Sequence, residues 1–268
     1  MSAAVERHPD GAISVEARGP LLLMGLDRPE KYNGLTPKML SELTDAFTRL
    51  ERDPALRVGV VFGHGRHFTA GLDLPKWVDG MKSGERDRGE AEGRIDPFGL
   101  ARKGSKPVVC AVHGITYTAG IELMLACDIA VAADDCRFSQ LEPKRGIMAT
   151  GGATFRFVER GGWGNAMYHL LVVDEFGAEE ARRCGLVQEV VPAGTQLDRA
   201  LLLAGKIAAL APLAIQATKA SARLYAEQGE QACIAAFRAV QQRLANSEDA
   251  AEGVRSFVER REPRFTGR

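Results

Sequence analysis

The middle of the chain contains the segment Val112-His113-Gly114-Ile115-Thr116-Tyr117-Thr118-Ala119-Gly120-Ile121-Glu122-Leu123. This segment predicts the end of a buried strand, a loop that contains glycine, and then the start of a helix. Free backbone N–H groups at a helix start, together with the positive end of the helix dipole, suit a developing negative charge. Glu122 falls in the first turn, where a carboxylate is also favoured for purely structural reasons. The segment alone is therefore a candidate site and no more.

A second glycine-containing segment, Phe68-Thr69-Ala70-Gly71-Leu72-Asp73, follows an apolar run at 58–62. Glycine at this place lets the backbone approach a ligand closely, or turn where other residues cannot. An ordinary turn between a strand and a helix explains the same residues equally well.

The rest of the chain alternates strands and helices and then becomes helical. Thr36 caps a helix with Pro37 at its first position, and apolar residues follow at helical spacing to Leu50. A further short helix is expected at 118–126, and almost the whole chain beyond Pro192 reads as helix. The expected strands cover residues 12–17, 21–26, 58–62, 107–112 and 129–133. This order indicates an α/β core followed by helices alone.

The polar, glycine-containing stretch 79–96 has little to bury, and we expect a surface loop there of the kind that often covers a site. The expected division is an α/β core at 1–195 and a helical segment at 196–268.

Composition excludes several classes of protein. The 268 residues are 45% hydrophobic, and Lys plus Arg and Asp plus Glu both number 35, so the formal net charge is zero. Such a chain lacks the basic surface that nucleic acids or anionic membranes attract. The five cysteines are scattered without a C-x-x-C pair, which disfavours disulfides and zinc sites. No apolar run approaches the roughly 18–20 residues that span a bilayer. We expect a cytoplasmic protein that binds no nucleic acid, no membrane and no metal.

Several catalytic motifs are missing from the sequence. It contains no G-x-x-x-x-G-K-[ST], G-x-S-x-G or H-E-x-x-H, and its glycine-rich stretches do not complete a G-x-G-x-x-G after a strand. A dehydrogenase that uses a nicotinamide cofactor is therefore a weak interpretation.

Taken in order, short motifs along nearly the whole chain resemble the crotonase (enoyl-CoA hydratase/isomerase) superfamily. Each motif is weak alone, and the ordered set is specific. The matching residues are Asp27-Arg28-Pro29 with Asn33-Gly34-Leu35, Ala70-Gly71-Leu72-Asp73, Gly120-Ile121-Glu122-Leu123, Cys127-Asp128, Phe138-Ser139-Gln140-Leu141-Glu142, Gly151-Gly152, Ala178-Glu179-Glu180-Ala181 with Gly185-Leu186-Val187, and Ser256-Phe257-Val258-Glu259-Arg260-Arg261.

The resemblance implies a spiral core of repeated ββα units and a C-terminal helical trimerisation segment, in a homotrimer or homohexamer. It implies that Glu122 and Glu142 are the acids that add and remove water. It also implies an oxyanion hole made by the backbone N–H groups of Leu72 and Ala119. The substrate would be an acyl-CoA, with coenzyme A as part of it and no separate cofactor. The implied substrate-binding residues are Lys31, Ala70, Gly71, Leu72, Asp73, Leu74, Ala119, Gly120, Phe257 and Arg260.

Three departures from the family pattern leave the exact reaction open. Ala119 stands where glycine is usual, and Leu72 is bulky for the other oxyanion position. Glu142 is followed by Pro143-Lys144-Arg145-Gly146, where most hydratases have proline before the glutamate and apolar residues after it. Met148-Ala149 also replaces a common proline.

The first hypothesis is an enoyl-CoA hydratase, because both glutamates are present. The alternatives are another acyl-CoA reaction (isomerase, decarboxylase, thioester hydrolase or dehalogenase) and a non-catalytic acyl-CoA-binding paralogue. Sequence alone does not say which glutamate is the acid, nor which acyl group is accepted.

Other candidate residues have simpler structural interpretations. His64, His67 and His113 are expected to be turn or strand-end residues, and Lys144 with Arg145 a solvated pair. Trp77 and Tyr117 beside core strands are expected to pack. For Phe257 and Arg260, packing at a subunit interface is almost as good an explanation as contact with a neighbouring subunit's coenzyme A.

Overall fold

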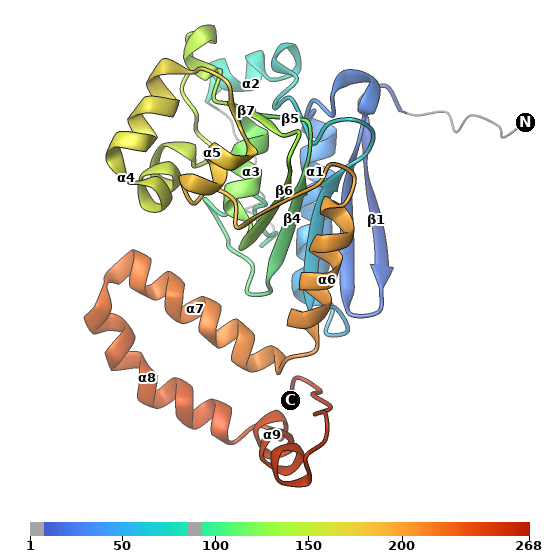
Figure 1. Ribbon diagram of the computed structural model, residues 1–268, viewed down its shortest axis with the longest axis vertical. Helices are drawn as coiled ribbons and strands as arrows, with labels where there is room; N and C mark the ends of the chain where they lie inside the picture. Colours follow the sequence, from blue (N-terminus) through green and yellow to red (C-terminus); the bar gives the residue numbers. More distant parts are fainter. Residues whose placement is uncertain (1–7, 85–92) are drawn as a thin grey trace, which may run out of the picture.

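A six-stranded sheet forms the centre of the molecule (Figure 1). The computed structural model describes residues 8–84 and 93–268. The strand order is β1-β2-β3-β4-β6-β9, with β1 antiparallel to β2 and every other neighbouring pair parallel. The strands are β1 (Ala12–Arg18), β2 (Leu21–Asp27), β3 (Val58–Gly63), β4 (Val108–Val112), β6 (Ile129–Ala133) and β9 (Glu189–Val191).

A second, three-stranded sheet has the order β5-β7-β8. Its strands β5 and β7 directly follow β4 and β6 in the chain. Its members are β5 (Ile115–Tyr117), β7 (Arg137–Ser139) and β8 (Phe176–Gly177). Two successive strands therefore go to different sheets before a helix follows, as in β4-β5-α3, where α3 is Ala119–Ala126. This is the repeated ββα unit that the resemblance implied.

The large sheet is covered on both faces, which explains why its central strands are continuously apolar. Leu22, Met24 and Val61 face the main core, which also holds residues of α1 (Pro37–Arg52) and α3. Leu23 and Val60 face the opposite side, where α6 (Gln196–Ala208) packs on the sheet. The contact face of α6 consists of the buried residues Ala200, Ala204 and Ala208.

Thr36 caps α1 as expected, because its side-chain oxygen accepts a hydrogen bond from the N–H of Met39 (3.2 Å). The expectation of a surface loop over the whole of 79–96 is wrong at its start. Helix α2 (Val78–Ser83) begins there, with Asp79 in its first turn and Gly84 in the left-handed conformation after its end. Residues 85–92 of that stretch lie outside the described residues.

The C-terminal helices extend away from the sheet (Figure 1). The expected boundary at residue 196 falls at the start of α6, which packs on the core, and α7 to α9 follow beyond one end of the sheet. These helices are α7 (Pro212–Gln228), α8 (Glu230–Ala245) and α9 (Glu248–Glu259). Among the described residues, no single helix is long and apolar enough to cross a membrane; α6 and α7 pass that test only as a pair bent by 106°.

Candidate active site

The backbone at Leu72 is fixed by a parallel bridge to Leu35. Leu35 N donates to Gly71 O (2.8 Å), and Asp73 N donates to Leu35 O (2.9 Å). In a parallel bridge of this kind the N–H of Leu72 itself points away from Leu35. Within the described ranges that N–H has no acceptor. It is therefore available to an oxyanion.

The second predicted oxyanion position, Ala119, is the first residue of α3. Thr118 precedes it with a positive φ (49°), and Thr118 N donates to Ser139 O (3.0 Å). Ala119 N has no acceptor in the part of the chain that the structure describes. The Ala119 side chain is 4% exposed and belongs to the main core. The methyl group that departs from the family pattern is thus accommodated by packing, and the N–H remains available.

The two oxyanion segments touch each other through positions that have no side chain. A Cβ on Gly71, whose φ is +97°, would overlap Thr118 Oγ1, and a Cβ on Gly120 would lie 2.6 Å from Thr69 Cγ2. Thr69 Oγ1 donates to Asn33 O (2.7 Å) and accepts from Gly71 N (3.1 Å). The sequence motifs around these residues therefore meet in space as one structure.

Glu122 is buried, and its carboxylate lies at the start of α4 (Ala153–Val172). Its Oε1 accepts hydrogen bonds from Gly151 N (2.6 Å) and Ala153 N (3.2 Å). A Cβ on Gly151 would lie only 2.5 Å from Glu122 Oε2, so glycine is needed for this approach. Two backbone donors and the positive end of a helix dipole both stabilise a negative charge at Glu122.

Glu142 lies on a 3-10 turn (Glu142–Arg145) after β7 and is also buried. Burial raises the pKa of its carboxyl to about 7, and the negative charge of Glu122 acts in the same direction, against a backbone hydrogen bond that lowers it. The fully buried Gln140, with its amide turned so that nitrogen faces the carboxyl, donates to Oε2 (3.0 Å) and Oε1 (3.1 Å) of Glu142. The two glutamates therefore occupy different electrostatic environments.

The predicted residues near the first oxyanion segment lie beside it. Ala70 N donates to Tyr32 O (2.9 Å), directly after the turn that holds the exposed Lys31. Asp73 pairs with the buried Arg28 (2.8 Å) and precedes the half-buried Leu74.

Phe257 and Arg260 are not brought to the site by their own chain. Phe257 is 84% exposed on α9, and Arg260 is exposed just after it. Figure 1 places α9 at the opposite end of the molecule from α2 and β5. Within one chain these two residues are separate from the glutamates.

The simpler interpretations of the other candidates agree with the contacts. His113 lies beside Gly65 O (Nε2 to O, 3.0 Å), and Trp77 Nε1 donates to Leu35 O (2.8 Å). Lys144 and Arg145 are both exposed.

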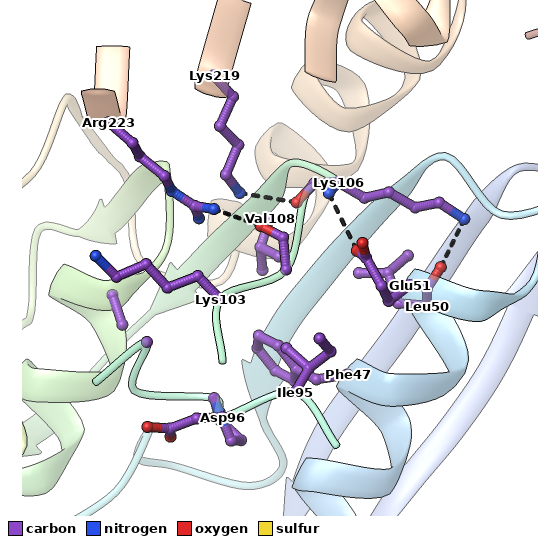
Figure 2. A pocket seen from close by; sticks show the side chains of 14 residues that line it. Phe47, Leu50, Glu51, Ile95, Asp96, Lys103, Lys106, Val108, Lys219 and Arg223 are labelled. Carbon is purple, nitrogen blue, oxygen red and sulfur yellow. Dashed lines mark hydrogen bonds between the residues drawn. The ribbon is translucent and has the colours of Figure 1, made fainter. Parts of the chain in front are cut away.

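A cavity away from the two glutamates lies between the core and α7 (Figure 2). Lys106 Nζ donates to Leu50 O (2.7 Å), Lys219 Nζ to Lys106 O (2.8 Å), and Arg223 Nη1 to Gly104 O (2.6 Å). Lys219 also pairs with Asp128 (2.6 Å). The hydrogen bonds of Lys219 and Arg223 therefore attach α7 to the core.

His169, Glu180 and Cys184 form a cluster whose ligand atoms lie within 4.8 Å of one another. Glu180 Oε1 already accepts from Arg183 Nη2 (2.6 Å) and lies 3.1 Å from His169 Nε2. The Arg183 guanidinium thus supplies the positive charge that a metal ion would bring, and hydrogen bonding accounts for the cluster.

Sequence reasoning missed two residues beside the glutamates. Gln140 was part of a matching motif but was given no role, and Arg156 was not singled out. Arg156 Nη1 donates to Gly151 O (3.0 Å), next to the donors of Glu122. The available signal was an arginine four residues after a Gly-Gly pair that was already of interest.

Comparison with known proteins agrees with this geometry. Residues 16–268 match the family model described as enoyl-CoA hydratase/isomerase. The chain belongs to the enoyl-CoA hydratase/isomerase family. The crotonase-type fold and a hydratase-like enzymatic activity, both expected from the sequence, are confirmed at this level.

Two curated relatives of this family are similar over nearly their whole length. The 2,3-dehydroadipyl-CoA hydratase of Escherichia coli K12 is 34% identical over 250 residues, covering 92% of this chain and 96% of the relative. The enoyl-CoA hydratase EchA19 of Mycobacterium tuberculosis is 34% identical over 268 residues, covering 99% and 100%.

Solved structures of the family superpose closely. A "probable enoyl-CoA hydratase/isomerase" from Mycobacterium abscessus has a TM-score of 0.92 at 43% identity, covering 96% of this chain and 98% of that chain. An enoyl-CoA hydratase from Mycobacterium tuberculosis H37Rv has a TM-score of 0.87 at 35% identity, covering 97% and 100%.

Proposed function

We propose that this enzyme adds water across the double bond of a 2-enoyl-CoA, with Glu122 as the base and Glu142 as the acid. The observation that carries the proposal is the contrast between two buried carboxyl groups. Glu122 accepts two backbone N–H groups at a helix start, which favours its carboxylate. Burial, with a smaller contribution from the charge of Glu122, raises the pKa of Glu142 to about 7, so about half of this carboxyl still holds a proton at neutral pH.

The proposed step begins as Glu122 takes a proton from water. The water oxygen forms a bond to C3, and the electron pair of the C2–C3 double bond moves toward the thioester, leaving negative charge on its oxygen. The N–H groups of Leu72 and Ala119 stabilise this charge without reorganisation, an effect worth about 3–4 kcal/mol per donor where measured. Glu142 then gives its proton to C2. The proton now on Glu122 returns to Glu142 through solvent, which completes the cycle.

The substrate supplies coenzyme A, and these steps need no further cofactor. We assign Lys31, Ala70, Gly71, Asp73, Leu74 and Gly120 to the binding surface around the two N–H donors. Both relatives described above carry the name of a hydratase of a CoA thioester, which supports this substrate class.

Assembly into a homotrimer or homohexamer belongs to the same proposal. The segment 196–268 contains α7 to α9, which lie apart from the sheet and expose large apolar side chains. Exposed apolar area of this extent is typical of a surface that is buried against another subunit. Phe257 and Arg260 would then reach the coenzyme A of a neighbouring subunit.

The test is hydration of crotonyl-CoA and of longer 2-enoyl-CoAs, followed by loss of the absorbance of the conjugated thioester. Turnover that falls by about 10²–10⁴-fold in both Glu122→Gln and Glu142→Gln, with coenzyme A affinity retained, supports the assignment. A Glu142→Gln enzyme with wild-type rates indicates a one-acid reaction such as isomerisation. Binding without turnover of any thioester indicates a non-catalytic paralogue.

A further inference from the structure

Arg156 lies in the first turn of α4, behind the turn that holds Glu122. Its Nη1 donates to Gly151 O (3.0 Å) and its Nη2 donates to Phe98 O (2.6 Å). The side chain is half-buried and joins two segments that are far apart in the sequence. One segment contains Phe98, which packs against the main core, and the other supplies the donors of Glu122.

The Gly151-Gly152 pair has one charged side chain against each glycine. A Cβ on Gly151 would lie 2.5 Å from Glu122 Oε2, and a Cβ on Gly152 would overlap Arg156 Nη1. Gly152 also has a φ of +112°, which side-chain-bearing residues rarely adopt. The turn therefore lies between the carboxylate and the guanidinium, and both need the space that glycine leaves.

The charges around this turn favour an ionised Glu122. A proton on Glu142 removes the like charge that would oppose the Glu122 carboxylate, and the positive charge of Arg156 attracts that carboxylate. Burial lowers the pKa of the Arg156 guanidinium, and the negative charge of Glu122 opposes this shift. The other titratable groups whose charges reach Arg156 are Arg160, Glu159 and Cys127.

We propose that Arg156 is the positioning residue of Glu122. It fixes the Gly151 carbonyl, and so the orientation of the turn that donates to Glu122, while its positive charge keeps the Glu122 carboxyl ionised beside Glu142. Arg156 acts through Glu122 and does not contact the reacting atoms. This inference rests on the proposed role of Glu122 as a base.

The test compares Arg156→Met with Arg156→Lys in the pH dependence of crotonyl-CoA hydration. We expect Arg156→Met to lower kcat on the order of ten-fold or more with a smaller change in KM, and to move the acid limb of the profile to higher pH. Arg156→Lys keeps the charge, so its acid limb stays at the wild-type position. Adding Arg156→Met to Glu122→Gln causes little further loss, because the arginine acts through the removed carboxylate.

Arg160→Met is the matched control, because Arg160 lies one turn later on α4 and also donates to main-chain oxygens, those of Leu125 (2.7 Å) and Cys127 (3.4 Å). Its removal leaves the acid limb in place. If Arg156→Met does not fold, Arg156→Gln replaces it as the neutral variant in the same comparison. An unmoved acid limb in the folded neutral variant, or a loss that adds in full to that of Glu122→Gln, overturns the proposal.

A second readout does not depend on turnover. The ¹³C NMR titration of the Glu122 carboxyl, assigned by its loss in Glu122→Gln, moves to higher pH in Arg156→Met if the proposal holds. An unmoved titration contradicts the role of Arg156. A wild-type enzyme that hydrates no enoyl-CoA contradicts the proposed function instead, so the two failures are distinguishable.

Discussion

Gly71 and Thr118 lie so close that a single methyl group on Gly71 would overlap the Thr118 hydroxyl oxygen. The two residues precede the two proposed oxyanion donors, Leu72 and Ala119, in segments nearly fifty residues apart. Their contact brings the two segments together. The proposed oxyanion hole therefore requires a residue without a side chain at position 71.

Gly71→Ala should consequently separate the donors and lower kcat for crotonyl-CoA hydration by about 10²-fold or more, the cost of losing one oxyanion donor. Steady-state kinetics together with circular dichroism measure this effect. Gly19→Ala is the matched control, since Gly19 also has a positive φ (55°) but has nothing within 4 Å of its would-be Cβ. Equal activity losses in both variants would show that backbone strain, and not the contact with Thr118, is responsible.

Ala119 allows the N–H itself to be tested. Ala119→Pro removes the donor at the first position of α3, where a helix tolerates proline, and should abolish turnover in a protein that still folds and binds coenzyme A. Ala119→Gly restores the residue usual in the family and should keep or modestly raise activity, with a broader range of acyl groups. Near-normal turnover in a folded Ala119→Pro enzyme would contradict the oxyanion hole as placed.

The raised pKa of Glu142 predicts how the rate of hydration changes with pH. Because Glu142 must be protonated to deliver a proton to C2, kcat/KM should fall as pH rises through about 7, the pKa to which burial raises this carboxyl. In Glu142→Gln the residual rate should lose this basic limb. A basic limb that persists in the variant would have to come from another group.

The same pKa also links stability to pH. The pKa of the Glu142 carboxyl is about 7 in the folded protein and 4.5 for an unperturbed glutamate, so the protonated side chain stabilises the fold. This stabilisation is complete below pH 4.5 and is lost as pH rises through about 7. Glu142→Gln removes the titration. The free energy of unfolding of the variant, relative to wild type, should therefore rise between pH 4.5 and 8 by up to about 3 kcal/mol. Denaturant unfolding at fixed protein concentration measures it, with the exposed Glu230→Gln as a control that shows no such trend.

The C-terminal helices should carry the contacts between subunits. Ile234 and Phe237 on α8 are 48% and 54% exposed, and Phe257 on α9 is 84% exposed. Light scattering at micromolar concentration should give the molar mass of a trimer or hexamer. Phe237→Asp should lower this molar mass toward that of smaller species. Val15→Asp introduces the same charge at a 39% exposed position of β1 and should leave assembly unchanged. A monomeric wild-type protein would contradict this assignment.

Local patterns in the sequence predicted most of the fold. Strands β1 to β4 and β6, the capped start of α1 and the start of α3 follow from residues adjacent in the chain, where periodicity and capping were sufficient. The strands β5, β7, β8 and β9 and the helix α4 were not predicted. Helix α2 was missed because the expected loop was judged on its polarity, although Asp79 and Gly84 are ordinary signals for the beginning and end of a helix. Both glutamates were identified through the family resemblance.

The partners of those glutamates could not be predicted. The hydrogen bonds from Gly151 and Ala153 to Glu122 join residues 29 and 31 positions apart, and no periodicity encodes such a contact. The same holds for Arg156, whose hydrogen bond to the backbone oxygen of Phe98 joins residues 58 positions apart. Three-dimensional packing alone shows why the two carboxyl groups differ.

The hydrogen bonds of Thr69 have a consequence for folding. This one side chain joins the turn at Asn33 to Gly71, while its backbone carbonyl accepts a hydrogen bond from Tyr117 N (3.0 Å). The oxyanion hole therefore closes loops of more than thirty residues on either side of Thr69. Contacts so distant in sequence form slowly, because loop-closure entropy must be overcome before they stabilise the chain. The β2–β3 and β3–β4 pairings of the large sheet close loops of similar length over the same parts of the chain, so the proposed oxyanion hole forms together with the sheet and not before it.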